Sequence, residues 1–298
     1  METRRLRILL ELSRLGSMRA VAEEMGVTTS TVSQQIAALA RETGAALIEP
    51  DGRRIRLTPA GRRLAEHSVT ILAAVDAARL DLDPTGEPAG TLRVSGFATA
   101  IRRSLLPIVD HLREHHPRVR VSILEHEPFE QFALLAVDDI DLALMYDYNL
   151  APAAFDATVT ARPLWTVPWG LGVPAAAPGS DFRDHDWIVN SRNTADEDVV
   201  RALASIAGFT PRVAHQADSL VLVQDLIVAG LGVGMLPADQ PTQPGVRLVP
   251  LTDPPVRLRA YAVTRRGRET WPPLALVLRM LTAGTPRRRP GTTPRPPG

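Results

Sequence analysis

Residues 18–44 read MRAVAEEMGVTTSTVSQQIAALARETG, and this stretch decides the fold of the first part of the chain. Its opening residues follow a helical period, and Gly26 ends that helix because glycine readily takes the left-handed conformation needed at a helix C-terminus. A hydroxyl residue after the turn can cap a second helix by accepting a hydrogen bond from a backbone N–H. The second helix places Val32, Ile36 and Leu39 on one face. The pattern therefore predicts a helix-turn-helix.

The opposite face of the second helix carries short hydroxyls and amides with almost no charge. Such a face is unusual for a merely solvated surface, but it suits base edges in a DNA groove. Glutamine can make two hydrogen bonds to adenine, and serine or threonine can reach either base of a pair. An ordinary helical hairpin is the alternative. The candidate DNA contacts in this segment are Thr28, Thr29, Ser30, Thr31, Ser33, Gln34 and Gln35.

A β-hairpin is predicted directly after these helices, in residues 48–58 (IEPDGRRIRLT). Apolar and basic residues alternate in its second half, and the Asp51-Gly52 pair is typical of a hairpin turn. Arg53 and Arg54 are expected near the tip, where a wing can lay arginines along phosphates or into a narrow minor groove. The alternative for any one arginine is a solvated surface charge. Together with the two helices, the hairpin predicts a winged helix-turn-helix that binds double-stranded DNA.

A long helix is predicted after the hairpin, from Thr58 to about Leu82. Thr58 suits the N-cap, and Pro59 suits the first helical position because its missing N–H costs nothing there. The Pro- and Gly-rich residues 83–90 then break the helix. An amphipathic helix between two domains must bury its apolar stripe, and packing on its own domain is one way to do so.

From Thr91 onward the sequence predicts alternating strands and helices. The repeated strand–helix–strand order favours parallel sheets with right-handed crossovers. Two such cycles, with crossings near 161–164 and 257–262, predict two α/β lobes that form a clamp like that of periplasmic binding proteins. The expected strands are 91–95, 119–124, 141–145, 165–173, 187–189, 213–217, 230–237 and 258–264, and the expected helices are 103–116, 128–137, 195–206, 219–229 and 272–281.

Several motifs of this chain occur together in one family of DNA-binding proteins. The segments VSQQI (32–36), RRIRLTPAG (53–61) and LIVAGLGVGMLP (226–237) resemble those of LysR-type transcriptional regulators, and the resemblance covers residues 4–281. Further residues match the N-terminal domain of that family. They are Gly16, Ser17, Ala20, Val21, Ala22, Leu39, Glu42 and Gly44.

The chain departs from the family at residues 28–31, TTST, where the family often has SQPA, and at residues 47–50, LIEP, where it often has LFER. The resemblance implies a cytoplasmic, nucleoid-associated bacterial regulator that binds operator DNA, responds to a small-molecule effector and acts with RNA polymerase. It also implies a homodimer, assembling into a homotetramer, in which the long helix pairs with its copy in a second subunit. The dimerisation candidates are Leu64, Ile71, Leu72 and Val75.

This organisation divides the chain into a DNA-binding domain, a linker, an effector-binding domain and a tail. The tail is rich in Pro and Arg and cannot bury enough apolar surface to fold, so it is predicted to be disordered. The expected bounds are 1–57 for the winged helix-turn-helix, 58–90 for the linker helix and hinge, 91–282 for the effector-binding domain (lobe I, 91–162 and 260–282; lobe II, 163–259) and 283–298 for the tail.

An effector site is expected between the lobes, because ligands of open α/β sheets bind beyond the carboxyl ends of the strands. Backbone N–H groups near Thr99 and Ala100 begin a helix there and favour a small anionic metabolite. Acidic residues near the same strand ends, such as Glu127 and Asp147, leave an amine or amino acid as the alternative ligand. Helix capping is the alternative role for single residues. The effector-binding candidates are Ser95, Thr99, Ala100, Ile101, Phe129, Tyr146, Asn190, Ser191, Thr194 and Asp218.

Composition and motifs argue against an enzyme, a cofactor or a metal site. The 298 residues carry a net charge of +1 and include no cysteine, which excludes disulfides and cysteine chemistry. The glycine-rich residues 230–234 follow a helix rather than a strand, so they do not form a dinucleotide-binding loop. The sequence contains no HExxH motif, P-loop or Ser-His-Asp signature, and no apolar run long enough to span a membrane.

Two alternatives to a transcriptional regulator remain. One is a small-molecule-binding protein whose N-terminal helices serve only dimerisation. The other is a hydrolase or transferase that uses the cleft between the lobes. The wing arginines and the neutral polar helix face favour a regulator over the first alternative, and the missing catalytic residues argue against the second.

Overall fold

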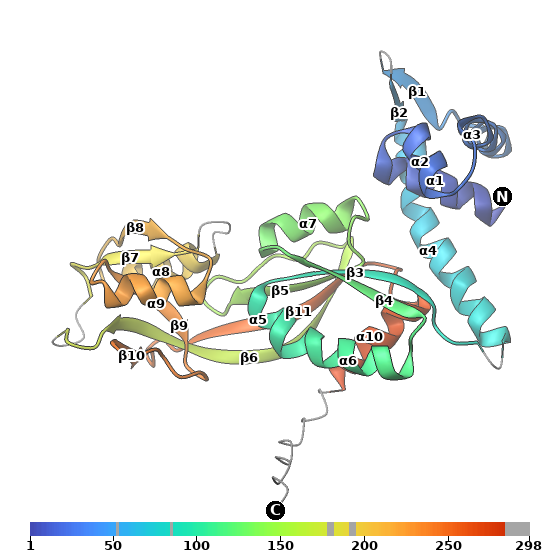
Figure 1. Ribbon diagram of the computed structural model, residues 1–298. Helices are drawn as coiled ribbons and strands as arrows, with labels where there is room; N and C mark the ends of the chain where they lie inside the picture. Colours follow the sequence, from blue (N-terminus) through green and yellow to red (C-terminus); the bar gives the residue numbers. More distant parts are fainter. Residues whose placement is uncertain (52–53, 84–85, 178–181, 191–194, 284–298) are drawn as a thin grey trace, which may run out of the picture.

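The computed structural model places the expected parts of the chain one after another (Figure 1). A group of helices with a β-hairpin comes first, a long helix follows, and a two-lobed α/β region forms the rest. The structure describes every residue except 52–53, 84–85, 178–181, 191–194 and 284–298. The predicted hairpin tip and all but the first residue of the predicted tail therefore lie outside the described residues. In the described segments, no helix has both the length and the apolar character needed to cross a membrane.

The helix-turn-helix forms as the sequence predicts. Helix α2 (Met18–Glu24) and helix α3 (Thr29–Thr43) are joined by a turn in which Gly26 has a φ of 63°. A residue with a side chain is strained at this φ, so glycine suits the position. Thr28 caps α3, since its Oγ1 accepts a hydrogen bond from the backbone N–H of Thr31 at 3.1 Å. This bond satisfies a donor that the first helical turn leaves unpaired.

The N-terminal domain is closed by helix α1 (Thr3–Leu15), which packs against α2 and α3. Strands β1 (Ile48–Asp51) and β2 (Arg54–Leu57) pair antiparallel and form the predicted hairpin. Burying one leucine-sized side chain contributes about 1.5–3 kcal/mol, so the shared apolar cluster is what holds these short elements together. The cluster consists of Leu6, Ile8, Leu9, Leu12, Val21, Ala22, Val32, Ile36, Leu39, Leu47, Ala65 and Leu72.

Helix α4 (Pro59–Leu82) connects the N-terminal domain to the α/β region. Thr58 caps it as predicted, because its Oγ1 accepts a hydrogen bond from the N–H of Gly61 at 3.0 Å. Leu72 is only 3% exposed, since it belongs to the N-terminal core of the same chain. That burial leaves Leu72 no surface for a second subunit. Its predicted dimerisation role is therefore corrected to a role in the domain core.

The rest of the predicted apolar stripe divides between two faces of α4. Leu64 and Ile71 are half-buried and pack against the N-terminal core, and Val75 is half-buried farther along the helix. Ala74 and Ala78 lie on the face that is open to solvent. Much of the stripe thus packs on its own domain, which was the alternative that the sequence left open.

The first α/β lobe keeps the predicted order of strands and helices. The helix after its first strand starts earlier than predicted, at Ala98, and passes through a π-helical turn before it becomes regular. Turns of this kind widen a helix and often lie at functional sites. The elements of this lobe are β3 (Gly90–Gly96), α5 (Ala98–Ala100), η1 (Ile101–Leu105), α6 (Leu106–His115), β4 (Val119–Glu125), α7 (Pro128–Ala136), β5 (Leu142–Tyr148) and the closing helix α10 (Pro272–Thr282).

The second lobe repeats this design and adds an edge strand. The sequence pattern did not reveal that strand, because it is short and lies between prolines. The elements of this lobe are β7 (Asp186–Val189), α8 (Ala195–Ile206), β8 (Arg212–Gln216), α9 (Leu220–Val228), β9 (Val233–Pro237) and the edge strand β10 (Val246–Pro250).

Two long antiparallel strands, β6 (Val159–Pro174) and β11 (Val256–Arg265), run through both lobes as the two predicted crossings (Figure 1). Around them the strands form one mixed sheet in the order β4-β3-β5-β11-β6-β9-β7-β8, with β10 paired to β6. The pairs β3–β4 and β3–β5 in one lobe and β7–β8 and β7–β9 in the other are parallel, as expected. The loops after these parallel strands are where a ligand site is expected.

Candidate DNA-binding surface and inter-lobe cavity

Helix α3 exposes the neutral polar face that the sequence predicts. It lies beside the β1–β2 hairpin, at the end of the molecule away from β7 and β8 (Figure 1). Its first turn contains no acidic residue, so its unpaired N–H groups can approach a phosphate. The predicted DNA contacts that α3 exposes are Thr29, Ser30, Ser33 and Gln34.

Three other predicted DNA contacts have partners within the domain. The Oγ1 of Thr28 caps α3 and lies 2.8 Å from the Oγ1 of Thr31. Gln35 is half-buried, and its Oε1 accepts a hydrogen bond from Nε of Arg5 at 3.0 Å. Gln35 therefore ties α3 to α1 through its Oε1.

The wing offers arginines on its strands and on the first turn of α4. Arg56 pairs with Glu49 across the hairpin at 2.8 Å, although such an exposed pair contributes little to stability. Arg63 is exposed and open to a phosphate. The predicted contact Arg53 lies outside the described residues, as does the side chain of Arg54.

A cavity of about 310 Å³ lies between the two lobes, where the effector site is predicted. Residues that follow the parallel strands of both lobes line it. Thr99 and Tyr146 of the first lobe and Asn190 and Asp218 of the second are the predicted site residues that it brings together. Other lining residues with polar or aromatic side chains are Phe97, Arg102, Arg103, Glu125, Glu127, Trp165, Trp169, Asp196, Ser219, Asp239 and Gln240.

Two predicted effector contacts lie away from this cavity. Phe129, in the first turn of α7, is 78% exposed, because the chain turns Glu127 rather than Phe129 toward the cavity. Ser95 is fully buried, and its Oγ lies 3.1 Å from Nδ1 of His126 inside the first lobe. Both predictions were wrong for the same reason, since closeness to a strand end does not decide which way a side chain points.

The helix start after β3 and one predicted acid also serve the fold. Ala100 is fully buried, and Ile101 packs beside the backbone of β3. Asp147 is held by Arg259, whose Nε and Nη2 each donate to it at 2.7 Å, and it does not line the cavity. Two further effector-binding candidates, Ser191 and Thr194, lie outside the described residues.

Aromatic rings form a connected wall beside the cavity. The rings of Phe97 and Tyr146 have centroids 4.7 Å apart, and Trp165 lies 6.2 Å from Phe97. Tyr148 continues the wall, 5.9 Å from Tyr146 and 5.4 Å from Trp169. Edge-to-face pairs of this kind hold rings in fixed positions, so the wall presents a rigid apolar surface to a ligand.

Carboxylates from both lobes meet at the cavity. Glu127 is 5% exposed, accepts a hydrogen bond from the hydroxyl of Tyr146 at 3.1 Å, and also caps α7. Asp196 reaches the cavity from the first turn of α8. Its burial raises the pKa of the Asp196 carboxyl to about 7, and the negative charges of Glu127 and Asp218 act in the same direction.

One ion pair bridges the two lobes at the cavity. Arg103 of η1 donates to Asp239, which follows β9, at 2.6 Å. The guanidinium also lies over the ring of Trp165, 4.6 Å from its centroid, and the indole N–H of Trp165 donates to Ser104 Oγ at 2.9 Å. The pair is thus a direct contact between the two lobes.

Some cavity residues were missed from the sequence, although a signal existed for two of them. Trp165 and Trp169 are an even number of positions apart on β6, so a strand period places both on one face. Nothing local marked Asp196 or Arg103, because their neighbours in the cavity come from distant segments. In the described part of the chain, no cluster of His, Asp and Glu is arranged to hold a metal ion.

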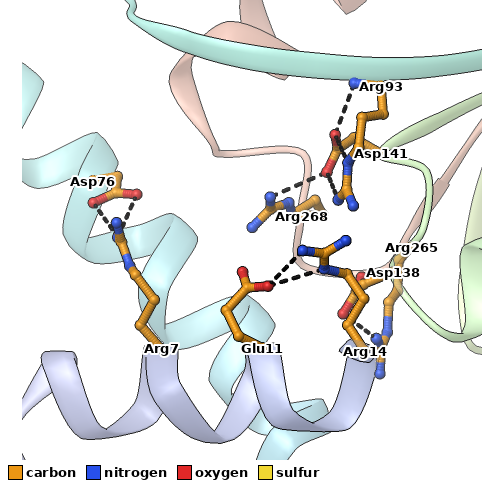
Figure 2. A network of polar contacts seen from close by, with 9 residues as sticks. All are labelled: Arg7, Glu11, Arg14, Asp76, Arg93, Asp138, Asp141, Arg265 and Arg268. Carbon is orange, nitrogen blue, oxygen red and sulfur yellow. Dashed lines mark hydrogen bonds and ion pairs between the residues drawn. The ribbon is translucent and has the colours of Figure 1, made fainter. Parts of the chain in front are cut away.

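Charged residues gather where helix α1 approaches the first lobe (Figure 2). On α1, Glu11 and Arg14 pair with each other at 2.9 Å. Figure 2 shows this pair near two aspartates of the first lobe and their arginine partners. In these, Asp138 accepts from Arg265 at 2.6 Å, and Asp141 accepts from Arg268 at 3.1 Å and from Arg93 at 3.0 Å.

The buried acids of this network have opposite pKa shifts. Burial alone would raise the pKa of Asp141, but hydrogen bonds from Arg93 and the charge of Arg268 outweigh it and lower the pKa. For Asp138, burial outweighs the charge of Arg265, and the pKa is raised. Two neighbouring carboxylates at the junction between the domains thus have pKa values shifted in opposite directions.

Comparison with protein families matches both parts of the chain. The model described as "Bacterial regulatory helix-turn-helix protein, lysR family" matches residues 3–62. The model described as "LysR substrate binding domain" matches residues 85–286. The first match covers α1 to the start of α4, and the second covers both lobes and the cavity between them.

Individual proteins resemble the chain over nearly its whole length. The transcriptional dual regulator GltC of Bacillus subtilis is 29% identical over 287 residues, which cover 91% of this chain and 93% of that protein. The regulator IlvR of Caulobacter vibrioides is 28% identical and covers 88% of this chain and 90% of its own. The structure of a full-length OxyR variant from Pseudomonas aeruginosa matches with a TM-score of 0.69 at 19% identity, covering 95% of this chain and 97% of that one.

Proposed function

The chain belongs to the LysR family of bacterial transcriptional regulators, and we propose that it reads its operator through α3 and the wing in response to a ligand in the inter-lobe cavity. The observation that carries this proposal is the exposed neutral face of α3 beside a basic hairpin. Gln34 and Ser33 are its central members. Arginines such as Arg63 would supply contacts to phosphates that fix the position on DNA without reading its sequence.

The division of labour that we propose follows the chain. Residues 1–57 bind DNA, 58–90 link and pair the subunits, and 91–282 bind the effector and move as two lobes. Subunits would pair through the open face of α4, which carries Ala74 and Ala78, because the opposite face is already covered by the N-terminal core. Two such dimers would form the tetramer.

The ligand is bound and released without being transformed. The carboxylates and aromatic rings that line the cavity suit the binding of a ligand. Ligand and operator affect each other reciprocally, with a coupling typically about 1–3 kcal/mol. Regulation would act on RNA polymerase at the promoter, with the protein on the nucleoid.

Selection from a random duplex library tests the DNA-reading role. The full chain should enrich a discrete sequence, and Gln34→Ala should lose about 1–3 kcal/mol of discrimination at one base pair. Gln216→Ala is the matched control, since Gln216 is an exposed glutamine on β8 in the second lobe, far along the chain from α3. If Gln34→Ala selects the same sequence with the same affinity as Gln216→Ala, the assignment of α3 as the reading helix is wrong.

A further inference from the structure

We infer that the inter-lobe cavity takes a cationic amine attached to an apolar or aromatic body, held between carboxylates of the two lobes. The inference rests on the proposed function, because it names the chemical class of the effector. It reverses the expectation of an anionic metabolite that the helix start near Thr99 suggested.

The charge of the cavity is the first reason. Among the described residues that line it, the carboxylates Glu125, Glu127, Asp196, Asp218 and Asp239 outnumber the cations Arg102 and Arg103. Asp239 already neutralises Arg103 at 2.6 Å, and Arg102 is exposed to water. An anion in the cavity would meet more negative than positive charge, whereas a cation would be attracted.

A buried acceptor without a partner is the second and independent reason. The Oδ1 atom of Asp196, a residue that lines the cavity, is shielded from solvent and makes no hydrogen bond of good geometry with a described residue. The fully buried hydroxyl of Tyr148 on β5 faces this carboxylate and favours its ionised form, but it too makes no hydrogen bond of good geometry in the described chain. Buried polar groups normally have partners, because an unsatisfied one is costly. An ammonium group, which has three donors, would satisfy Asp196.

The position of the carboxylates links binding to closure of the lobes. Glu127 belongs to the first lobe, and Asp196 and Asp218 belong to the second. Their like charges oppose each other across the cavity, and together with burial they make Asp196 bind a proton more readily than a free aspartate does. A cation between them turns this repulsion into attraction. Binding would therefore draw the lobes together by a small hinge movement about β6 and β11.

The aromatic wall suits the rest of such a ligand. Phe97, Tyr146, Trp165 and Trp169 bring ring surfaces to the same cavity as the carboxylates. A ring face attracts a cation and also packs against an apolar body. One ring is already used in this way inside the protein, since Arg103 lies over Trp165.

Calorimetry with matched probes tests the inference on the full-length protein. Phenethylamine and cadaverine are the cationic probes, and 3-phenylpropionate and glutarate are carboxylates of comparable size. We expect both amines to bind about tenfold or more tightly than their carboxylate counterparts. Asp196→Asn should weaken amine binding by about tenfold, because it removes the charge that the ammonium group faces. Asp198→Asn, on the exposed side of the same helix, should leave it within about twofold.

Each result decides the matter. Tighter binding of the carboxylates, no binding of either amine, or equal amine affinity in the Asp196→Asn and Asp198→Asn proteins would overturn the inference. The thermal stability of Asp196→Asn, measured in parallel, shows that the variant is folded. Selection of DNA by the unliganded protein is a separate readout. If DNA is selected but carboxylates bind better, the ligand class fails and the regulatory function stands; if no DNA sequence is selected, the regulatory function fails.

Discussion

Asp196→Asn should stabilise the effector-binding domain at alkaline pH, and the gain should shrink as the pH falls. The Asp196 carboxyl is buried beside the cavity, and its burial, with the charges of Glu127 and Asp218, raises its pKa from 3.8 to about 7. The folded protein therefore binds this proton more tightly than the unfolded chain does. Stability is then lost as the pH rises from about 4 to about 7. Asparagine carries no charge and avoids that loss.

The difference in pKa sets the size of the effect. At about 1.4 kcal/mol for each pKa unit, ionised Asp196 costs the folded state at most about 4 kcal/mol near pH 8 and less than about 2 kcal/mol near pH 5. The advantage of Asp196→Asn over the wild type should thus grow by up to about 3 kcal/mol between these two pH values. For a domain of this size, that corresponds to a difference of several degrees in Tm.

Thermal unfolding followed by tryptophan fluorescence measures this difference. All tryptophans of the chain lie in the α/β region, so the signal reports on the domain that contains Asp196. Asp198→Asn is the control, because Asp198 is exposed on the same helix and should change Tm little at either pH. An equal Tm shift for Asp196→Asn at both pH values, or a lower Tm than the wild type at pH 8, would refute the claim that burial and nearby negative charges destabilise the ionised form of Asp196.

Four further predictions concern the junction, the lobes, the dimer and the wing. Asp141→Asn leaves Arg93 with a weaker partner and should lower the unfolding free energy by about 1–3 kcal/mol at neutral pH. Because the Asp141 pKa is lowered, urea titrations should show a smaller loss in acid, where the wild type also gives up this charge. Arg103→Ala removes an ion pair between the lobes and should speed hydrogen exchange in the loop after β9. Ala78→Glu should give monomers in sedimentation that keep the wild-type circular dichroism spectrum, since Ala78 is exposed within one chain. Arg63→Ala should weaken binding to all DNA sequences and reduce the salt slope by about one.

The DNA-binding part could be predicted from sequence because its determinants are local. The glycine at position 26 and the caps at Thr28 and Thr58 act within one turn of their own position, and the structure confirms each of them. The role of Gln35 escaped prediction, because its partner Arg5 comes from another helix. Leu72 was misassigned for a related reason. The helical period shows that a stripe is buried, but it does not show whether the stripe packs on its own domain or on a second subunit.

The helices and strands of the two lobes could be predicted from the sequence, but the individual residues that line the cavity could not. Strand ends identified Tyr146, Asn190 and Asp218, because the carboxyl ends of parallel strands meet at one edge. Phe129 was wrong and Asp196 was missed, since side-chain direction and the approach of the two lobes depend on tertiary packing. Figure 2 shows Glu11 and Arg14 of α1 near Asp138, a residue more than a hundred positions away, and no periodicity reveals such an approach.

The central claim is that this chain reads DNA sequence through α3, and mapping its binding sites on genomic DNA tests it most directly. Purified protein should protect a small number of discrete sites, each with two related half-sites separated by whole turns of the double helix, as a symmetric dimer requires. The Gln34→Ala protein should lose these sites or shift their sequence, while the Gln216→Ala protein should protect the same ones. Binding spread evenly over the genome, or identical sites for both variants, would contradict the account.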